Sequence, residues 1–153
     1  MASAQAPQCI HANQYIRMYE HDPDGTSATL VTGAATPGID MSLYSHISIS
    51  GMTTVSASSS GISKVEIIAA DDDALTTNVV VVEEASATAD AVGDTIVVEA
   101  TAEQIGKLAD DNGYDTRYAG ARLTCSNSGD EAAVTYVALA ERPQLDLTAN
   151  VIS

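Results

Sequence analysis

Residues 39–50 read IDMSLYSHISIS, and this stretch decides the fold class. Apolar and polar side chains alternate along it with a period of two, which is typical of a β-strand with one buried face. The side chains expected on one face are Leu43, Ser45, Ile47 and Ile49, and those expected on the other are Tyr44, His46, Ser48 and Ser50. We therefore predict a single half-buried strand over residues 39–50.

The same kind of pattern recurs along the rest of the chain. Runs rich in β-branched residues are separated by clusters of Gly, Pro, Asp and Ser, as expected for short strands joined by turns. Four consecutive valines at 79–82 indicate a strand that is buried on both faces or packed in an interface. The further predicted strands cover residues 14–20, 27–32, 62–70, 78–83, 94–100, 117–125 and 131–141.

One segment, residues 101–112, changes period and predicts a short helix. Thr101 and Gln104 fit a capping box, and Asn112-Gly113 is a typical stop signal. A single helix excludes a parallel α/β fold, which needs helices between most strands. We therefore predict an all-β sandwich or jelly roll of about eight antiparallel strands with one short inserted helix. We expect this domain over residues 13–143, with an N-terminal arm at 1–12 and a C-terminal arm at 144–153.

The composition argues against nucleic acids and membranes as partners. Twenty-one Asp and Glu residues against 6 Lys and Arg residues give a formal net charge of −15. Such a surface repels phosphate backbones and anionic lipids. The sequence shows no signal-peptide pattern, and no apolar run approaches the roughly 20 residues that span a bilayer. We expect a soluble protein that is made in a cytoplasm.

The chain has neither Trp nor Phe, and this bears on its stability. Large aromatic side chains contribute the greatest buried area per residue, so a core of Ala, Val, Ser and Thr predicts a modestly stable subunit. Self-association would add the missing buried area. We expect the two cysteines, Cys9 and Cys125, to be unpaired thiols rather than a disulfide.

Motifs that carry chemistry are scarce. There is no Gly-x-Ser-x-Gly elbow, phosphate-binding glycine loop or Cys-x-x-Cys pair, and His11, His21 and His46 are not spaced as metal ligands on one element. Two acidic turns, residues 71–73 and 22–25, offer the hard oxygen ligands that calcium takes. We interpret both as turns in which Asp bonds its own backbone. We predict no enzymatic activity, no cofactor and no bound metal.

The predicted partner contacts lie in the arms and among the scarce cationic or titratable groups. A C-terminal arm with apolar residues covers either its own domain or a neighbouring subunit. His46 is an interface or pH-sensing group, or a solvated strand position. Arg117 and Arg122 pair with carboxylates within or between subunits, or lie on the outer face of a sheet. The predicted contact residues are Cys9, Ile10, His46, Arg117, Arg122, Leu145, Leu147, Val151 and Ile152.

Several segments occur in an order and spacing that suggest a family. They are Ile39-Asp40-Met41-Ser42-x-Tyr44, VEIIAADD at 65–72, DTRY at 115–118, AGARLTCSNSGD at 119–130 and AAVTYVALAERPQ at 132–144. Over roughly residues 39–144 the chain resembles small tailed-phage virion proteins with a jelly-roll fold. The Ala-rich residues 84–92 depart from that pattern, and we interpret them as a loop or an insertion.

The resemblance implies a head decoration, or cement, protein. Such a protein would sit as a homotrimer on the capsid exterior, bind the major capsid protein and stabilise the shell by bridging its subunits. The resemblance implies no catalytic residue. One alternative is a carbohydrate- or receptor-binding β-sandwich of a phage fibre or tail, although the sequence suggests no tyrosine cluster. Another is a head–tail connector component, which would form larger rings.

Overall fold

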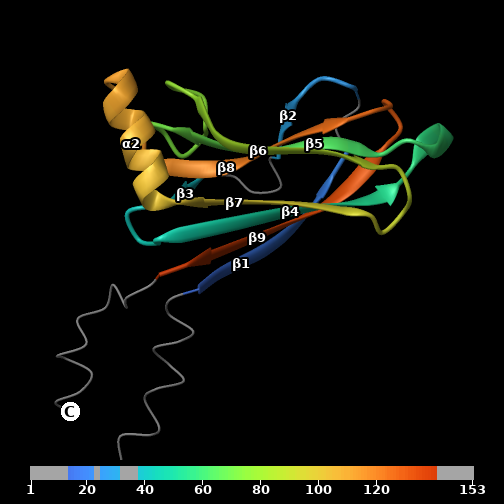
Figure 1. Cartoon of the computed structure of the whole chain (residues 1–153), viewed down its shortest axis with the longest axis horizontal. Helices are drawn as coiled ribbons and strands as arrows, with labels where there is room; N and C mark the ends of the chain where they lie inside the picture. The colour runs from blue at the N-terminus through green and yellow to red at the C-terminus, as the bar shows by residue number, and fades with distance from the viewer. Residues whose placement is uncertain (1–13, 23–24, 32–37, 141–153) are drawn as a thin grey trace, which may run out of the picture.

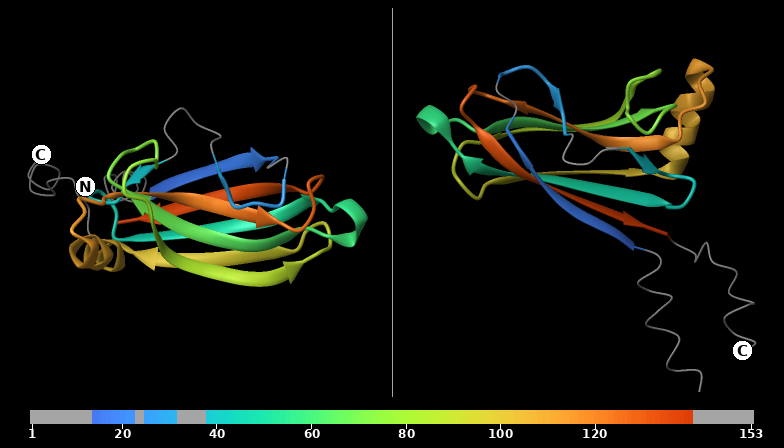
Figure 2. Two further views of the ribbon diagram at one scale, coloured as in Figure 1. Left: turned by 90° about the horizontal axis from the view of Figure 1, so that it is seen from above. Right: turned by 180° about the vertical axis from the view of Figure 1, so that it is seen from behind.

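The computed structural model describes residues 14–22, 25–31 and 38–140, and these form two antiparallel sheets packed face to face (Figure 1 and Figure 2). Sheet A has the strand order β1-β9-β4-β7, and sheet B has the order β2-β8-β5-β6 with β3 also paired to β8. The predicted all-β sandwich with one short helix is confirmed. The elements are β1 (Gln14–His21), β2 (Thr29–Leu30), β3 (Ile39–Asp40), β4 (His46–Val55), the 3-10 turn η2 (Ala57–Ser59), β5 (Ile62–Ala70), β6 (Val80–Ala89), β7 (Thr95–Thr101), α2 (Ala102–Asn112), β8 (Tyr118–Cys125) and β9 (Glu131–Leu139).

The strands pair in a nested order from the two ends of the chain inward. β1 pairs with β9, β2 and β3 pair in turn with β8, β4 pairs with β7, and β5 pairs with β6. Two further pairings, β4 with β9 and β5 with β8, join these pairs into the two sheets. Because β2 and β3 act as two halves of one strand, this is the double Greek-key arrangement of a jelly roll.

The core between the sheets consists mainly of small and β-branched side chains. Ile47 and Ile49 of β4 are fully buried, as their alternation predicted. Tyr136 is the exception in size, and its hydroxyl accepts a hydrogen bond from the Ala121 N–H of the opposite sheet at 3.2 Å. A Cβ at Gly51 would lie 3.1 Å from side-chain atoms of sheet B, so the sheets approach closely at this residue. Small side chains therefore close the core by letting the sheets come together.

The predicted single strand over residues 39–50 is wrong. β3 belongs to sheet B and β4 to sheet A, so the chain crosses from one sheet to the other at residues 41–45. Asp40 stabilises the crossing, because its Oδ1 accepts the Ser42 N–H at 3.0 Å and its carbonyl accepts the Leu43 N–H at 3.2 Å. Leu43, which was expected to be in the core, is 49% exposed. An Asp-initiated turn within an alternating pattern cannot be recognised from the alternation alone.

The valine-rich segment is an edge strand, which corrects the prediction of burial on both faces. β6 pairs only with β5; Val80 and Val82 are half-buried against the core, whereas Val79 and Val81 are exposed. β6 also extends to Ala89, so much of the Ala-rich stretch is strand rather than loop. An apolar run has the same appearance in a buried strand and in an edge strand with one covered face. The strand predicted over residues 27–32 is shorter than expected and reduces to β2.

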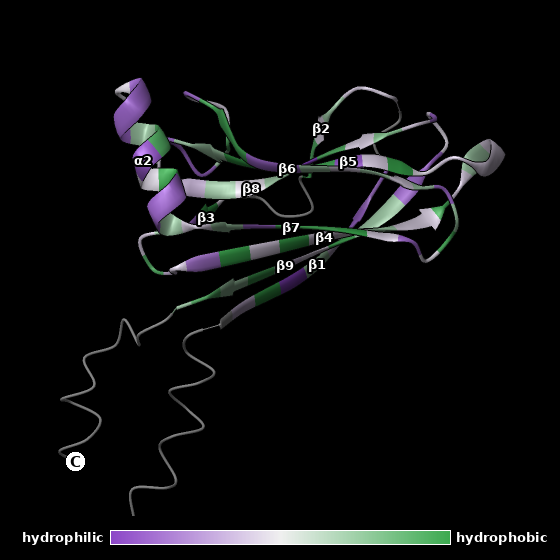
Figure 3. Cartoon of the chain, in the orientation of Figure 1, coloured by the Kyte–Doolittle hydropathy of each residue, from purple (hydrophilic) through white to green (hydrophobic). Residues whose placement is uncertain are grey.

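The helix is confirmed with its caps. The Thr101 side chain accepts the Gln104 N–H, the Gln104 side chain accepts the Thr101 N–H at 2.8 Å, and Gly113 ends the helix in the left-handed region with φ 69°. Ile105 and Ala109 are its buried residues, and α2 closes one end of the sandwich (Figure 1). Hydropathy colouring shows a largely hydrophilic helix beside strands with alternating bands (Figure 3). Among the described residues, no helix has both the length and the apolar character that crossing a membrane requires.

Candidate binding surface

The outer face of sheet A exposes large apolar side chains across several strands. In register, Met18 of β1 lies beside Thr135 of β9, then Ser50 of β4, then Val97 of β7. Met18 is 70% exposed and Val97 53% exposed. We call the outward-pointing residues of these strands the open face. It comprises Ile16, Met18, Glu20, His46, Ser48, Ser50, Met52, Thr95, Val97, Glu99, Glu131, Ala133, Thr135, Val137 and Leu139.

The charged groups of the open face are carboxylates near its margins. The carboxylates of Glu20 and Glu131 make no hydrogen bond or ion pair within the described part of the chain, and Oε2 of Glu99 lies 3.9 Å from Nε2 of His46. The one Lys or Arg in the four strands is Arg17, which packs over the Tyr15 ring at 5.2 Å and does not share the outward register. The large exposed side chains Met18 and Val97 therefore lie on the edge strands β1 and β7, with the uncharged Thr135 and Ser50 between them. The permanent charges of the open face are all negative.

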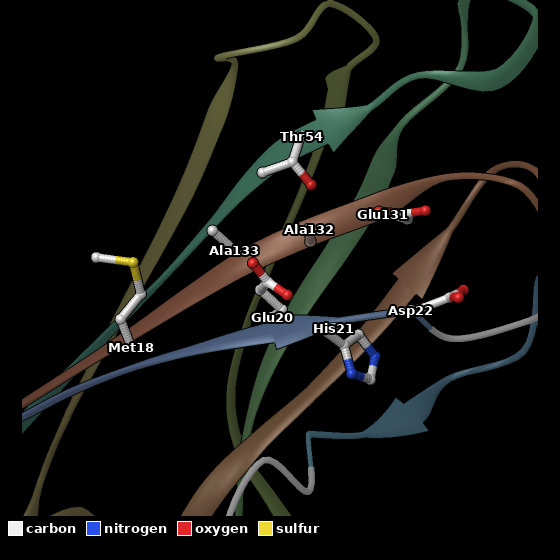
Figure 4. Close-up of a pocket in the computed structure, with 8 residues that line it drawn as sticks. All are labelled: Met18, Glu20, His21, Asp22, Thr54, Glu131, Ala132 and Ala133. Atoms are coloured by element: carbon white, nitrogen blue, oxygen red, sulfur yellow. The ribbon is translucent and has the colours of Figure 1, made fainter.

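A pocket of about 440 Å³ lies at one end of the open face, where β1 ends and β9 begins (Figure 4). Three of the lining residues carry carboxylates, and none carries a permanent positive charge. The apolar lining residues are Met18, Ala132 and Ala133. The lining residues are Met18, Glu20, His21, Asp22, Thr54, Glu131, Ala132 and Ala133.

His21 also borders this pocket, but it follows Glu20 on β1 and pairs with the buried Ala132, so its ring points to the inner side of sheet A, opposite the Glu20 side chain (Figure 4). Its residue is only 7% exposed, and its Nε2 is buried without a hydrogen-bond partner among the described residues. Burial lowers the pKa of His21, and the negative charge of Asp22 only partly offsets this effect. The ring is therefore neutral at pH 7 and offers one donor and one acceptor nitrogen. A buried ring nitrogen that lacks a partner costs free energy until a group from outside satisfies it.

The structure separates the predicted contact residues. His46 lies on the open face, at the end opposite the pocket. Arg117 binds the carboxylate of Asp40 and packs over the Tyr118 ring, whereas Arg122 belongs to the outer face of sheet B. Cys9, Ile10, Leu145, Leu147, Val151 and Ile152 lie outside the described residues, as do the predicted arms at 1–12 and 144–153.

The outer face of sheet B contains an ion cluster that sequence analysis missed. Glu66 is 3% exposed, and its carboxylate accepts hydrogen bonds from Nε of Arg122 at 2.9 Å and Nζ of Lys64 at 3.0 Å. Burial raises the pKa of Glu66, but the hydrogen bonds and charges of Arg122 and Lys64 outweigh it and hold the pKa below its usual value. The spacing Lys64-x-Glu66 on one strand face was the available signal. Both arginines that were predicted as contacts are thus paired within the chain.

A group of tyrosines corrects the expectation that no tyrosine cluster exists. The hydroxyls of Tyr15 and Tyr19 lie 3.1 Å apart, Tyr44 meets the Tyr15 ring edge-on, and Tyr136 meets the Tyr19 ring edge-on. Burial, together with the hydrogen bond shared with the Tyr19 hydroxyl, raises the pKa of Tyr15 to about 12. The rings are half-buried or buried and pack against the core. The pairing of β1 with β9 brings Tyr19 to Tyr136, and the crossing before β4 brings Tyr44 to Tyr15, neither of which the sequence reveals.

The acidic turn after β5 is held by its own hydrogen bonds. The carboxylate of Asp72 accepts the Thr76 N–H at 2.8 Å, the Thr76 hydroxyl at 2.6 Å and the Thr77 N–H at 2.9 Å. These bonds lower the pKa of Asp72 to about 2. Among the described residues, no group of three or more His, Cys, Asp or Glu side chains is arranged to hold a metal ion. In the other acidic turn, residues 23–24 lie outside the described part.

Cys125 is a free, buried thiol at the end of β8, as expected for this residue. Burial raises its pKa to about 11, so the thiolate is scarce at neutral pH. The thiolate is the reactive form of cysteine. Cys125 is therefore a packing residue of the core rather than a reactive group.

Comparisons with known proteins assign no family. No protein-family model matches the chain, and no curated protein matches it. The function is therefore inferred from the fold and from the surface of the molecule.

Proposed function

We propose that the protein is a non-enzymatic virion component that decorates the outside of a phage head. In this role it binds the major capsid protein, acts as a homotrimer and stabilises the shell by bridging capsid subunits. The observation that carries the proposal is the open face. It spans four strands, exposes Ile16, Met18 and Val97, and is left uncovered by the described residues. Several large apolar side chains exposed on one face of a sheet often mark a surface that another macromolecule covers.

The position of the chain ends supports the same proposal. Gln14 and Leu139 are register partners at the start of β1 and the end of β9. The segments that precede and follow the domain are therefore attached at one corner of the open face. Trimeric display multiplies weak contacts by raising the effective concentration.

Native mass spectrometry and cosedimentation test the proposal. We expect a homotrimer, and we expect it to sediment with heads of the encoding phage that were assembled without this protein. Val97→Asp places a charge on the open face and is expected to weaken head binding at least tenfold. Val81→Asp is the matched control, because Val81 is an exposed valine of β6, on the outer face of sheet B. It is expected to bind heads as the wild type does.

Two results would contradict the proposal. A protein that never sediments with the heads is not a decoration protein. Equal losses of binding for Val97→Asp and Val81→Asp would show that the open face is not the contact surface. A ring larger than a trimer would favour a head–tail connector component instead.

A carbohydrate- or receptor-binding role is the second candidate, and the tyrosine group favours it. Tyr15 and Tyr44 are half-buried, and the guanidinium of Arg17 lies 5.2 Å from the Tyr15 ring centre. Aromatic rings beside a hydrogen-bond donor are a common platform for sugars. A glycan-array signal that is lost in Tyr44→Ala, with unchanged head binding, would support this second role.

A further inference from the structure

The outer strands of the two sheets differ in how their free edges are protected. In sheet B, β2 and β3 are two residues long, and the register of β6 with β5 shifts twice. In sheet A, β7 lies close to β6 of the other sheet and leads directly into α2. Short strands, bulges and prolines are the usual protections against pairing with another chain. β1 has none of these: its eight residues pair with β9 without a register shift and include neither Pro nor Gly (Figure 1).

The backbone groups of β1 that face this edge follow from the hydrogen bonds of the sheet. The Thr53 N–H donates to the Asp94 carbonyl at 2.9 Å, so the backbone groups of Thr53 face β7. Successive residues of an antiparallel strand face one neighbour and then the other. Followed through β4 and β9, this alternation directs the N–H and carbonyl groups of Ile16 and Met18 away from β9. Accordingly, the Ile16 carbonyl accepts a hydrogen bond from Nη1 of Arg17 at 2.9 Å.

The side chains of residues 16–18 form an apolar–cationic–apolar pattern at this edge. Ile16 and Met18 are exposed on the open face, and Arg17 points to the opposite side of the strand. The Arg17 guanidinium contacts only its own strand, where it packs over the Tyr15 ring, and it forms no ion pair within the described part of the chain. The edge therefore offers backbone hydrogen-bonding groups, two apolar side chains and one cation without a carboxylate partner.

A segment of the chain beyond the described residues carries the complementary pattern. Residues 144–148 read QLDLT, and in an extended strand Leu145 and Leu147 share one face while Asp146 lies on the other. Residues 145–147 are thus apolar–anionic–apolar. Laid along residues 16–18, they place apolar side chains beside apolar ones and Asp146 opposite the arginine. Opposite charges in such a cross-strand position are stabilising, and like charges are destabilising.

The direction of pairing distinguishes a neighbouring copy from the same copy. The segment leaves β9 after Leu139, whose register partner is Gln14 at the start of β1. Pairing within one copy would therefore run parallel to β1, after a link that has to pass the chain entering Gln14. A neighbouring copy can supply the segment antiparallel, which is the direction of all the described strand pairs and the more stable ladder. A strand that each copy gives to the next is a heterologous contact, which can close into a ring.

We infer that residues 144–148 of one copy add as an antiparallel strand to the β1 edge of the next copy, with Asp146 opposite Arg17. These two residues then form a non-hydrogen-bonded pair, in which cross-strand side chains lie closest. The inference rests on the proposed function only for the number of copies in the ring, which is three. Strand addition at an open edge needs no phage head. It can therefore be tested on the isolated protein.

Amide hydrogen exchange of the full chain, followed by NMR, tests whether the β1 edge is paired. The N–H groups of Ile16 and Met18 are expected to exchange about tenfold more slowly, or slower still, in the wild type than in Asp146→Arg. This substitution leaves β1 itself unchanged. The same alternation directs the Val97 N–H to the opposite edge of sheet A, so its exchange rate should be equal in both proteins.

Charge reversal, followed by sedimentation velocity, tests which residues pair. Arg17→Glu and Asp146→Arg are each expected to weaken self-association about tenfold or more, because like charges would then face each other. Arg17→Glu combined with Asp146→Arg restores an opposite pair and is expected to recover the association of the wild type. Asp111→Arg, at an exposed residue of α2, is the matched control and is expected to have no effect.

Three results would overturn the inference. Equal exchange of the Ile16 and Met18 amides in the wild type and Asp146→Arg would show that the segment does not pair with β1. Slow exchange in a protein that sediments as a monomer would place the segment on its own copy. A double variant that associates as weakly as the single variants would exclude the pairing of Arg17 with Asp146. A chain that exchanges strands but does not bind heads would contradict the proposed function alone.

Discussion

The two outer faces of this sandwich consist of similar antiparallel strands but differ in how they are covered. On sheet B, Ile68 is 2% exposed because it packs with Leu75 from the following turn and with Leu30 of β2. On sheet A, Ile16 and Met18 have no such cover in the described residues and are 53% and 70% exposed. The chain therefore covers one face with its own turn, and the described residues leave the other face uncovered.

The charged residues show the same difference. Glu66 on sheet B is buried and paired with Arg122 and Lys64, whereas Glu20 and Glu131 beside the open face have no partner in the described part. Cations are scarce in this chain, and the described ones on sheet B serve intrachain pairs. Carboxylates that lack an internal cation are the groups that an external cation can bind. The comparison thus identifies the face on which to test for binding.

The largest effect is expected from a matched pair of Ile→Ala substitutions on the two faces. Ile68→Ala removes a buried side chain and is expected to lower the free energy of unfolding by about 3 kcal/mol. Ile16→Ala removes an exposed side chain and is expected to change it by less than about 0.5 kcal/mol. Urea denaturation of both variants measures the difference. Similar losses would show that the open face is covered in solution.

The next effect concerns the buried carboxylate of sheet B. Glu66→Gln is expected to cost about 2 kcal/mol at pH 7, below the range for a fully buried pair, because Arg122 and Lys64 are about 30% exposed and partly solvated. The folded pKa of Glu66 is lowered from 4.5, so its contribution is complete above pH 4.5 and is lost as the pH falls through the folded value.

Urea denaturation at several pH values measures this contribution. The difference in the free energy of unfolding between the wild type and Glu66→Gln should become smaller below pH 4.5. Glu83→Gln, at an exposed residue of β6, is the control and should follow the wild type throughout. A free-energy difference that does not change with pH would show that the charge of Glu66 does not stabilise the outer face of sheet B.

A smaller effect is expected from Arg122→Lys. The guanidinium binds both carboxylate oxygens of Glu66, through Nε at 2.9 Å and Nη2 at 3.3 Å, and lysine cannot reproduce this fork. We expect a loss of about 1 kcal/mol in the free energy of unfolding. Arg17→Lys on the edge of sheet A is the control, with a change below about 0.5 kcal/mol. Equal losses would contradict the role of the fork.

The smallest effect is expected from Val97→Thr, which lies midway along the edge strand β7 of the open face. The two side chains have nearly the same shape, and Val97 is 53% exposed. The free energy of unfolding should change by less than about 0.5 kcal/mol and should not depend on protein concentration. Denaturation at two protein concentrations measures the free energy of unfolding, and analytical ultracentrifugation measures the association state. A loss that appears only at high concentration would mean that another copy of the chain covers the open face.

The sequence predicted helix and strand bounds well where local signals, such as a helix cap or a turn, determine them. β5 has the predicted bounds, β8 begins one residue later than expected, and the Thr101 capping box fixes the start of α2. The errors arose where pairing with a strand distant in the sequence determines the structure. Alternation over residues 39–50 continued through a crossing between sheets, and four valines did not reveal that β6 has only one neighbour. Sheet edges are properties of pairing and not of sequence.

The candidate surface was less predictable than the fold. His46 was predicted as a contact and lies on the open face, but the pocket, the Glu66 cluster and the tyrosine group depend on register between distant strands. The His21–Ala132 pairing, for example, joins the first and last strands of the domain. A single sequence carries the residue types for such sites but not the register that assembles them.

The nested pairing of the strands also determines when the domain can form during synthesis. β1 leaves the ribosome first, yet its one neighbour in the sheet is β9, the last strand. Until residues 131–139 have been translated, Ile16 and Met18 belong to an unpaired strand with open backbone groups, which is a template for aggregation. The sheet around β1 therefore cannot form until β9 has been translated. A polypeptide truncated before β9 should aggregate instead of forming a smaller jelly roll.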